Sequence, residues 1–410
     1  MLNTCQTNAM ELLESPCNVF LTGGAGSGKS FLIRHFLKKS SATIPVLAST
    51  GAAAILVGGR TFHSFFGLGI LEGGVEKTVE KAVKNKRLLD RVRSSHTVII
   101  DEISMIPGVA FQAAEKIARL ARKKDRPWGG MRVIAVGDFS QLPPVTRSGE
   151  ARDWAFLSET WRISAFLPAV LKTIVRTDDI DFLEVLNFVR SGIVNERVMK
   201  FLKERTSPPQ DDFEGTRMFP LRRTTEEYNL KKLGKLTSAV VTFPTQYSGE
   251  AKAIESMKMN APVPELIQLK KGALVMLRQN DPEGRWVNGS LATVLSLEAE
   301  ELKVELLDNK YVAEIERATF HLLDANGERA ASASNFPVTL AYATTIHKAQ
   351  GTTLDRMMVD LANLWEPGHA YVALSRVRAP SGLFIEKWSP RSIMVDPAVT
   401  HFHQNLSSPE

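Results

Sequence analysis

Short apolar runs rich in β-branched residues alternate with amphipathic stretches through the first half of the chain. Four of these runs have the length of buried strands and are bounded by polar or glycine-containing segments: 18–22, 45–48, 97–100 and 132–136. The stretches between them have the pattern of helices. Strands that alternate with helices in this way predict a parallel α/β sheet with helices packed on its faces.

One of the helical stretches, residues 76–93, is unusually basic. It carries seven Lys or Arg and three acidic residues around Val79, Val83, Leu88 and Val92. The spacing predicts an amphipathic helix in a small insertion. Its charged side is either an ordinary solvated face or a surface turned towards nucleic acid, and the sequence leaves both interpretations open.

The second half of the chain begins differently, after a polar, proline-containing loop at 207–212. Between about 266 and 320, short strand-like runs are separated by Asn-Gly, Pro and Gly, which predicts a small β-barrel insert with strands at 273–277, 292–297 and 302–307. After residue 334 the mixed pattern returns. We therefore expect a second α/β domain interrupted by the barrel, with strands at 338–342, 356–360 and 383–386.

Composition narrows the class of protein. At roughly 150 residues per domain, 410 residues are enough for two or three domains. A composition of 44% hydrophobic and 23% charged residues is typical of globular proteins and excludes disordered, collagen-like and coiled-coil chains. The net charge of +6 is compatible with a polyanionic partner. The two cysteines, Cys5 and Cys17, are too few for a disulfide framework or a cysteine-based zinc site, which indicates a reducing compartment.

Targeting signals are not evident in the sequence. No run approaches the roughly 18 apolar residues that a membrane span needs, and no Lys or Arg precedes Lys29, where a signal or transit peptide would carry positive charge. We expect a soluble, cytoplasmic protein without a membrane partner.

The string GGAGSGKS, residues 23–30, follows the first predicted strand and opens the helical stretch 31–38. This is the context of a phosphate-binding P-loop. Its glycines allow backbone N–H groups to turn towards phosphates, Lys29 is expected to reach the β- and γ-phosphates, and the Ser30 hydroxyl is expected to bind Mg²⁺. The predicted nucleotide loop comprises Gly23, Gly24, Ala25, Gly26, Ser27, Gly28, Lys29 and Ser30.

Two further predicted strands also end in polar residues. Residues 97–100 are followed by Asp101 and Glu102, which we expect to hold Mg²⁺ and to orient and deprotonate the attacking water, respectively. Residues 132–136 are followed by GDFSQLPP, in which Gln141 is placed to sense a γ-phosphate. By itself Gln141 would be an ordinary loop residue. Because ligands of open α/β sheets bind at the carboxyl ends of the strands, the three strand ends together predict an ATP-hydrolysing site.

Several strings beyond the nucleotide loop complete a pattern: ASTGAAA (48–54), DEISM (101–105), VGDFSQLPPV (136–145), AYATTIHKAQG (341–351) and YVALSRV (371–377). In order and spacing they resemble the motifs of superfamily-1 helicases of the RecD and petite-integration-frequency (Pif) group. The likeness runs from Leu2 to about Phe384. PWGGMRVIAVGDF, LKTIVRT and WVNGS resemble segments of the Pif branch, although Trp128 stands where its signature usually has Phe.

The resemblance implies a fold. It implies two RecA-like P-loop domains with ATP bound between them, a small insertion in the first domain and an SH3-like β-barrel inserted in the second. On this chain the expected boundaries are 1–165 for the first domain, with a wedge insertion at about 66–95, then 166–264 and 336–410 for the second domain, and 265–335 for the barrel.

The resemblance also implies roles for single residues. Gln6 matches the glutamine that reads adenine, Gly351 matches a nucleotide-site position, and Arg176 and Arg376 match two arginines that reach the γ-phosphate from the second domain. Without the family, Arg176 would be interpreted as a salt-bridged surface residue. The positions that match single-stranded DNA contacts are Thr50, Gly51, Phe62, His63, Thr345, His347 and Lys348.

Among these DNA positions, Phe62 and His63 have side chains that could stack on bases without reading sequence. A core role for Phe62, and structural roles for His63 and His347, are the alternatives.

The function implied is an ATP-dependent and Mg²⁺-dependent DNA helicase that moves 5′ to 3′ on single-stranded DNA and unwinds duplex. The alternative is a DNA-dependent translocase that displaces proteins or remodels structures without unwinding, and a strand-displacement assay separates the two. The implied partners are single-stranded DNA and forked or structured DNA, with G-quadruplexes and RNA–DNA hybrids also compatible. We expect a monomer from a bacterial, archaeal or phage source.

Overall fold

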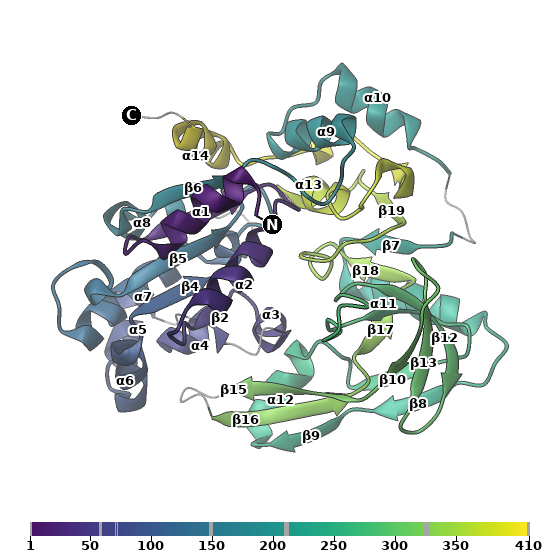
Figure 1. Ribbon diagram of the computed structural model, residues 1–410, viewed down its shortest axis with the longest axis horizontal. Coiled ribbons are helices and arrows are strands. Elements are labelled where there is room, and N and C mark those ends of the chain that lie inside the picture. Colours follow the sequence, from purple (N-terminus) through teal and green to yellow (C-terminus); the bar gives the residue numbers. More distant parts are fainter. Residues whose placement is uncertain are drawn as a thin grey trace. The chain divides into compact units, whose positions relative to one another are not determined.

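The computed structural model describes residues 2–56, 60–69, 71, 73–146, 151–208, 213–323 and 328–407. Its contacts divide the chain into two units, and most of their elements are labelled in Figure 1. The first unit contains the described residues of Met1–Arg176, Leu322–Ala330 and Val395–Glu410, and the second contains those of Thr177–His321 and Ala331–Met394. This division differs from the boundaries expected from the sequence in three places: near residue 165, at the described residues of 322–330, and at the C-terminal segment.

The first unit is built on a parallel sheet, as the sequence predicted. Its strand order is β3-β2-β4-β5-β1-β6, and every neighbouring pair is parallel. The four strands expected from the apolar runs are all present. The strands are β1 (Val19–Gly23), β2 (Val46–Ala48), β3 (Arg60–Thr61), β4 (Thr97–Ile100), β5 (Arg132–Gly137) and β6 (Leu167–Leu171).

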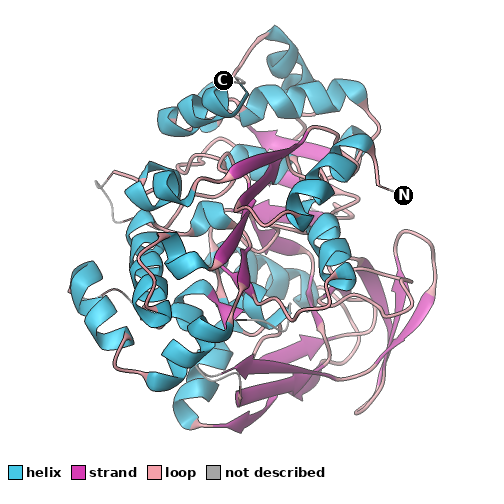
Figure 2. Cartoon of the chain, turned by 60° about the vertical axis from the view of Figure 1, so that its left-hand side comes forward, coloured by secondary structure: helices cyan, strands magenta, loops and turns pink. Residues whose placement is uncertain are grey.

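Both faces of this sheet are buried, so alternate residues of each strand belong to different cores. On one face, Val19 and Leu21 pack with α1 (Thr4–Glu14) and α2 (Lys29–Lys39). On the other, Phe20 contributes to a larger core that includes apolar residues of α7 (Gly108–Arg122). Figure 2 shows the helices on both sides of the strands.

The basic stretch forms two helices, α5 (Gly74–Ala82) and α6 (Lys86–Ser94), where the sequence predicted one. The chain breaks between them because the Asn85 side chain accepts a hydrogen bond from the backbone N–H of Leu88 (3.1 Å) and so starts a new helix. Val79, Leu88 and Val92 are buried in the larger core, as the amphipathic pattern predicted. The charged sides of both helices are exposed.

The PWGG segment is a structural element of the first unit. Trp128 has a left-handed backbone (φ 57°), and its backbone N–H donates to the buried Glu115 carboxylate (3.0 Å). Its indole Nε1 donates to the Ser164 hydroxyl (2.8 Å), and its ring lies 5.0 Å from that of Phe111. The indole N–H therefore finds a partner inside the core.

The C-terminal helix α14 (Pro397–Ser407), yellow in Figure 1, belongs to the first unit. The sequence-based boundaries assigned this segment to the second domain. The physical reason for the difference is apolar packing: Val399 is buried, and the Phe402 ring stacks on Phe156 (4.4 Å) and meets Phe139 edge-on (5.2 Å). These contacts cover the end of β5 with residues that follow the second unit in sequence.

The second unit also has a parallel sheet, with strand order β18-β7-β19-β20. The predicted strands 356–360 and 383–386 are β19 (Met357–Asp360) and β20 (Leu383–Lys387). The remaining elements of this part are β7 (Thr216–Phe219), β18 (Ala343–Thr345), α9 (Ile180–Arg190), α10 (Glu196–Glu204), α11 (Arg222–Gly234) and α13 (His369–Leu374).

An antiparallel sheet of order β14-β13-β12-β11-β17 is inserted between β7 and β18. Its strands are β11 (Leu274–Leu277), β12 (Leu291–Leu297), β13 (Leu302–Leu306), β14 (Val312–Ile315) and β17 (Val338–Leu340). The run 338–342 was expected in the second α/β sheet, and that prediction is wrong. The run instead supplies β17, which pairs with β11 of the antiparallel sheet, and the residues that follow the run form β18 of the parallel sheet.

Shorter elements complete the insertion. β8 (Val241–Pro244) pairs with β10 (Leu266–Leu269), and a three-stranded sheet has the order β15-β16-β9. The remaining bounds are β9 (Gln246–Gly249), α12 (Ala251–Asn260), β15 (Ala318–Leu323) and β16 (Arg329–Asn335). Across the described ranges, every helix is too short or too polar to span a bilayer.

A tight ion pair holds the turn that precedes WVNGS. The Asp281 carboxylate accepts hydrogen bonds from Nε and Nη2 of Arg285 (both 2.8 Å) and from the backbone N–H groups of Glu283 and Arg285. The Arg285 side chain, with help from these N–H groups, lowers the pKa of Asp281 to about 2.

This pKa gives a stability prediction. Because the pKa of Asp281 is lower in the folded state than its ordinary 3.8, the carboxylate stabilises the fold above that value and loses its contribution as the pH falls towards 2. We expect Asp281→Asn to lower the melting temperature by a few degrees near neutral pH, and the difference from the wild type to shrink below pH 4. Thermal melts across pH measure this, with the exposed Asp178→Asn as control. A difference that does not depend on pH would contradict the assignment.

Candidate nucleotide and DNA site

The predicted phosphate loop lies between β1 and α2. Gly26 (φ 80°) and Gly28 (φ 90°) have left-handed backbones, which glycine adopts without strain. A Cβ atom at Gly26 would lie 2.6 Å from Cβ of Arg176, and one at Gly28 would lie 2.8 Å from Nε2 of Gln6. Conformation and close packing therefore both require glycine here. The loop leads into an eleven-residue helix, whose N-terminus favours anions.

The side chains of the loop suit a phosphate ligand. Nζ of Lys29 donates to the carbonyl oxygens of Gly23 (2.8 Å) and Gly24 (3.2 Å), which holds the ammonium group over the loop. The Thr22 and Ser27 hydroxyl groups are buried and have no hydrogen-bond partner among the described residues. Buried polar groups are normally paired. Unpaired hydroxyls beside a lysine are what a site for a polar anion would contain.

Asp101 and Glu102 follow β4 directly. The Asp101 carboxylate accepts the backbone N–H of Glu102 (3.0 Å). Burial raises the pKa of Asp101, while that N–H and the positive charge of Lys29 act in the opposite direction. Glu102 has a left-handed backbone (φ 52°), a conformation that costs a non-glycine residue on the order of 1–3 kcal/mol and that occurs often at functional sites.

Gln141 ends a tight turn after β5. The Asp138 carboxylate accepts the backbone N–H of Ser140 (3.1 Å), and the Asp138 carbonyl accepts that of Gln141 (2.9 Å). Gln141 is only 5% exposed. Because β4, β5 and β1 are consecutive strands of one parallel sheet, their carboxyl ends meet at one edge. The fold thus brings Lys29, Asp101 and Gln141 to the same edge of the sheet.

Two residues implied by the family resemblance also lie at this loop. The Gln6 side chain accepts the backbone N–H of Asn3 (3.1 Å) and lies next to Gly28. Arg176 lies beside Gly26, and the N–H of Val175 donates to the Gly26 carbonyl (2.9 Å). Arg176 was expected in the second domain. This hydrogen bond joins the segment that contains Arg176 to the phosphate loop, and Arg176 belongs to the first unit.

The other expected nucleotide residues belong to the second unit. Arg376 is 2% exposed, and its guanidinium donates from Nε to the Val372 carbonyl (2.8 Å) and from Nη2 to the Ser375 hydroxyl (2.8 Å). These bonds hold it against the end of α13. Gly351 is exposed, with a left-handed backbone (φ 77°).

The expected DNA positions of the first unit have different environments. Thr50 precedes α3 (Gly51–Leu56), and its hydroxyl accepts the N–H of Ala53 (3.2 Å). Phe62, at the start of α4 (Phe62–Phe66), is 0% exposed and packs 5.2 Å from the Phe66 ring. A ring enclosed in the core cannot stack on a base, so the proposed stacking role of Phe62 is wrong. His63 stays partly exposed, and burial lowers its pKa.

In the second unit, Thr345 ends β18, and His347 and Lys348 lie in the turn that follows it. The buried Thr345 hydroxyl accepts the backbone N–H of Lys348 (3.1 Å), whereas His347 and Lys348 are exposed. Partial desolvation, and then the positive charges of Arg222 and Arg278, lower the pKa of Lys348. The sequence reasoning missed both arginines, because their approach to Lys348 depends on how α11, β11 and β18 meet.

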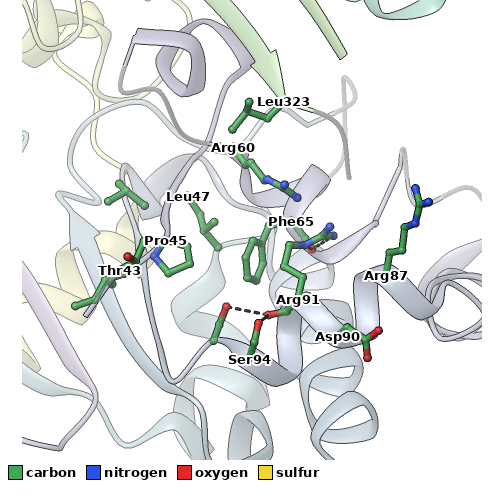
Figure 3. Close-up of a pocket in the computed structure, with 13 residues that line it drawn as sticks. Thr43, Pro45, Leu47, Arg60, Phe65, Arg87, Asp90, Arg91, Ser94 and Leu323 are labelled. Carbon is green, nitrogen blue, oxygen red and sulfur yellow. Dashed lines mark hydrogen bonds between the residues drawn. The ribbon is translucent and has the colours of Figure 1, made fainter. Parts of the chain in front are cut away.

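A cavity of about 810 Å³ lies elsewhere in the first unit (Figure 3). Arg60, Arg87 and Arg91 line one side, and residues 43–47, which are apolar except for Thr43, line the other. Arg91 donates to the Phe65 carbonyl (2.6 Å), so its charge supports the end of α4. This cavity lies at the amino ends of β2 and β4, away from the strand ends that carry the phosphate loop and the acids. It is not part of the candidate nucleotide site.

The site could also hold a magnesium ion. Within the described ranges, no group of three or more His, Cys, Asp or Glu side chains is placed to hold a metal by itself. The Ser30 hydroxyl at the start of α2 and the Asp101 carboxylate are hard oxygen donors, and Mg²⁺ is usually bound by one or two such groups together with substrate phosphates.

The chain is similar in sequence to proteins of known family. A family model described as PIF1-like helicase matches residues 1–196. The chain is 52% identical to the ATP-dependent DNA helicase Pif1 of Bdellovibrio bacteriovorus, over 98% of this chain and 91% of that protein. It is 34% identical to the human ATP-dependent DNA helicase PIF1, over 95% of this chain and 61% of that longer protein.

Solved structures show the same likeness. Bacteroides Pif1 in complex with ADP-AlF4 superposes with a TM-score of 0.86 at 28% identity, covering 99% of this chain and 97% of that one. Bacteroides Pif1 bound to single-stranded DNA superposes with a TM-score of 0.67 at 29% identity, with the same coverage.

Proposed function

This chain belongs to the PIF1-like helicase family, and we propose that it is an ATP-driven DNA helicase that moves 5′ to 3′ on single-stranded DNA and separates duplex strands. The observation that carries the proposal is the set of residues at the carboxyl ends of the strands of the first sheet. There, three adjacent strands present a phosphate loop, a pair of acids and a buried glutamine, which are the groups that ATP hydrolysis requires.

Each residue of this edge has a proposed task. Lys29 and the backbone of the phosphate loop bind the β- and γ-phosphates of ATP, and Gln6 contacts the adenine. Ser30 and Asp101 would hold Mg²⁺, which would neutralise developing negative charge on the phosphates. Glu102 orients and deprotonates the attacking water, and Gln141 senses the γ-phosphate.

We propose that two arginines supply further positive charge to the phosphates of the bound nucleotide. Arg176 lies beside Gly26 of the phosphate loop, which supports the proposal that it acts on the γ-phosphate from the first unit. Arg376 is proposed as the second arginine. Since its guanidinium bonds to Val372 and Ser375, this role requires that it exchange at least one of those bonds for a phosphate oxygen.

For DNA, we propose that Lys348 contacts the phosphate backbone together with Arg278 and Arg222. Besides partial desolvation, the positive charges of Arg222 and Arg278 lower the pKa of Lys348, and Glu226 is the acidic side chain that opposes them there. Glu226 already accepts a hydrogen bond from Nε of Arg222 (2.6 Å). Nε of Arg278 is buried and has no hydrogen-bond partner among the residues described. An excess of positive charge with an unpaired donor favours a bound anion, and a DNA phosphate supplies one.

This cluster leads to a binding prediction. Lys348→Ala and Arg278→Ala are each expected to weaken single-stranded DNA binding and to reduce the slope of log K against log salt concentration by about 0.7, the value for one lost phosphate contact on a single strand. Fluorescence anisotropy titrations at several salt concentrations measure both quantities. Lys200→Ala, an exposed lysine of α10 in the same unit, is the control and should match the wild type. An unchanged slope would remove the residue from the DNA site.

The function itself is tested by ATP hydrolysis with Mg²⁺, with and without a single-stranded oligonucleotide at fixed salt. Strong stimulation is expected from a DNA-coupled motor, and no stimulation would argue against the coupling. A strand-displacement assay with 5′-tailed and 3′-tailed duplexes then tests unwinding and polarity. Stimulated hydrolysis without displacement would favour the alternative, a translocase that remodels complexes.

Forked DNA is the substrate with which we propose to begin. Two solved relatives are described as bound to single-stranded DNA and as unwinding forked duplex. G-quadruplexes and RNA–DNA hybrids are further substrates for the same assay. We propose that the protein acts as a monomer, because one chain carries every residue assigned to ATP.

A further inference from the structure

A histidine of the C-terminal helix contacts the turn that carries Gln141. Nε2 of His403 lies 3.2 Å from the Ser140 hydroxyl and 3.8 Å from the fully buried Asp138 carboxylate. Asp138 and Ser140 are themselves joined, because the same carboxylate accepts the Ser140 N–H. The imidazole thus forms a hydrogen bond with Ser140, the residue immediately before Gln141.

The helix that carries this histidine is firmly attached. Asp396 caps its start by accepting the N–H of Ala398 (3.0 Å), and the same carboxylate accepts the indole N–H of Trp154 (3.0 Å). Phe402, next to His403, packs against Phe156 and Phe139. Because Phe139 is itself part of the segment that ends in Gln141, α14 reaches this segment through both an aromatic contact and a polar one.

From these contacts we infer that His403 is a positioning residue for ATP hydrolysis, which holds the Asp138–Gln141 turn in the geometry that lets Gln141 sense the γ-phosphate. The inference rests on the proposed role of Gln141. It gives α14 a task in the chemistry of the first unit, although the helix follows the second unit in sequence. None of the motifs that carry the family resemblance includes this segment.

The geometry explains why a polar side chain is suited to this place. The Asp138 carboxylate, the Ser140 hydroxyl and the Gln141 side chain are all buried. A buried turn with several polar groups keeps one conformation only while its groups stay paired. Without His403, the Ser140 hydroxyl loses this partner and the turn becomes free to take other conformations. Substrate binding by Lys29 would be unaffected, but the population of hydrolysis-competent turns would fall.

The test compares His403→Phe, which keeps a ring beside Phe402, with His403→Gln, which restores a polar group. For His403→Phe we expect kcat of DNA-stimulated ATP hydrolysis to fall about five-fold, the kinetic equivalent of one lost neutral hydrogen bond, with KM for ATP unchanged. His403→Gln should recover most of the loss. His401→Phe, an exposed position of the same helix that contacts Asn405, is the matched control and should keep the wild-type kcat.

A double variant separates positioning from a general structural role. If His403 acts through Gln141, then His403→Phe should slow the Gln141→Ala protein no further. An equal five-fold loss in both backgrounds would overturn the inference, as would an unchanged kcat in His403→Phe. A wild-type kcat for Gln141→Ala alone would remove the sensor role of Gln141 in the proposed function, and the inference with it.

Discussion

Replacing Lys29 by alanine is expected to lower DNA-stimulated ATP hydrolysis by at least about 100-fold, the usual cost of removing one charge-stabilising donor from a reacting centre. The ammonium is held over the phosphate loop by the Gly23 and Gly24 carbonyls, and Lys29 is not among the residues proposed to contact DNA. Binding of single-stranded DNA should therefore survive. Steady-state hydrolysis and anisotropy on the same preparation measure the two effects.

The matched control is Lys39→Ala, at the other end of the same helix. Lys39 forms an exposed ion pair with Glu14 (3.3 Å), and such pairs contribute little to the stability of the fold. This variant should hydrolyse ATP like the wild type. If Lys29→Ala retained more than half of the wild-type rate, the phosphate loop would not be the catalytic nucleotide site.

Replacing Glu102 by glutamine is expected to give the second large effect, a fall in kcat of about 10²–10⁴-fold, as for the loss of a general base. The substitution preserves the shape of the side chain and leaves Lys29 and Asp101 in place. ATP should still bind, so the protein should accumulate in the ATP-bound state on DNA. Single-turnover hydrolysis, together with the lifetime of the DNA complex in ATP, measures this.

Glu76→Gln is the control for the loss of one negative charge in the same unit, since Glu76 is exposed and pairs with Lys116 (3.1 Å). It should turn over normally. Normal turnover in Glu102→Gln as well would remove the assigned role of Glu102 and leave its left-handed backbone without a functional explanation.

Much of the first unit could be predicted from sequence because both faces of its sheet are buried. A strand buried on both faces is a continuous apolar run, and such runs are visible in a single sequence at 97–100 and 132–136. The phosphate loop could also be predicted from the sequence, because glycines and a lysine at this spacing fit few structures other than a phosphate-binding turn. The polar residues at the strand ends then followed from the parallel topology.

The remaining features depended on contacts between distant segments. Phe62 matches a DNA position of the family, but a sequence does not show whether an aromatic ring points into the core. The run 338–342 was expected in the parallel sheet, and only the pairing of β17 with β11 reveals that it belongs to the antiparallel one. Arg222 and Arg278 approach Lys348 from separate elements, and His403 reaches Ser140 across more than 250 residues of sequence.

The place of α14 has a consequence for how the protein folds during synthesis. Domains of a growing chain generally fold in order, from the N-terminus. Here, the aromatic cluster of the first unit includes Phe402, which the ribosome adds after the whole second unit. Until α14 has been synthesised, the nascent first unit lacks the cover that Phe402 gives to Phe139 and Phe156, and a chaperone that shields aromatic surface would find its target there.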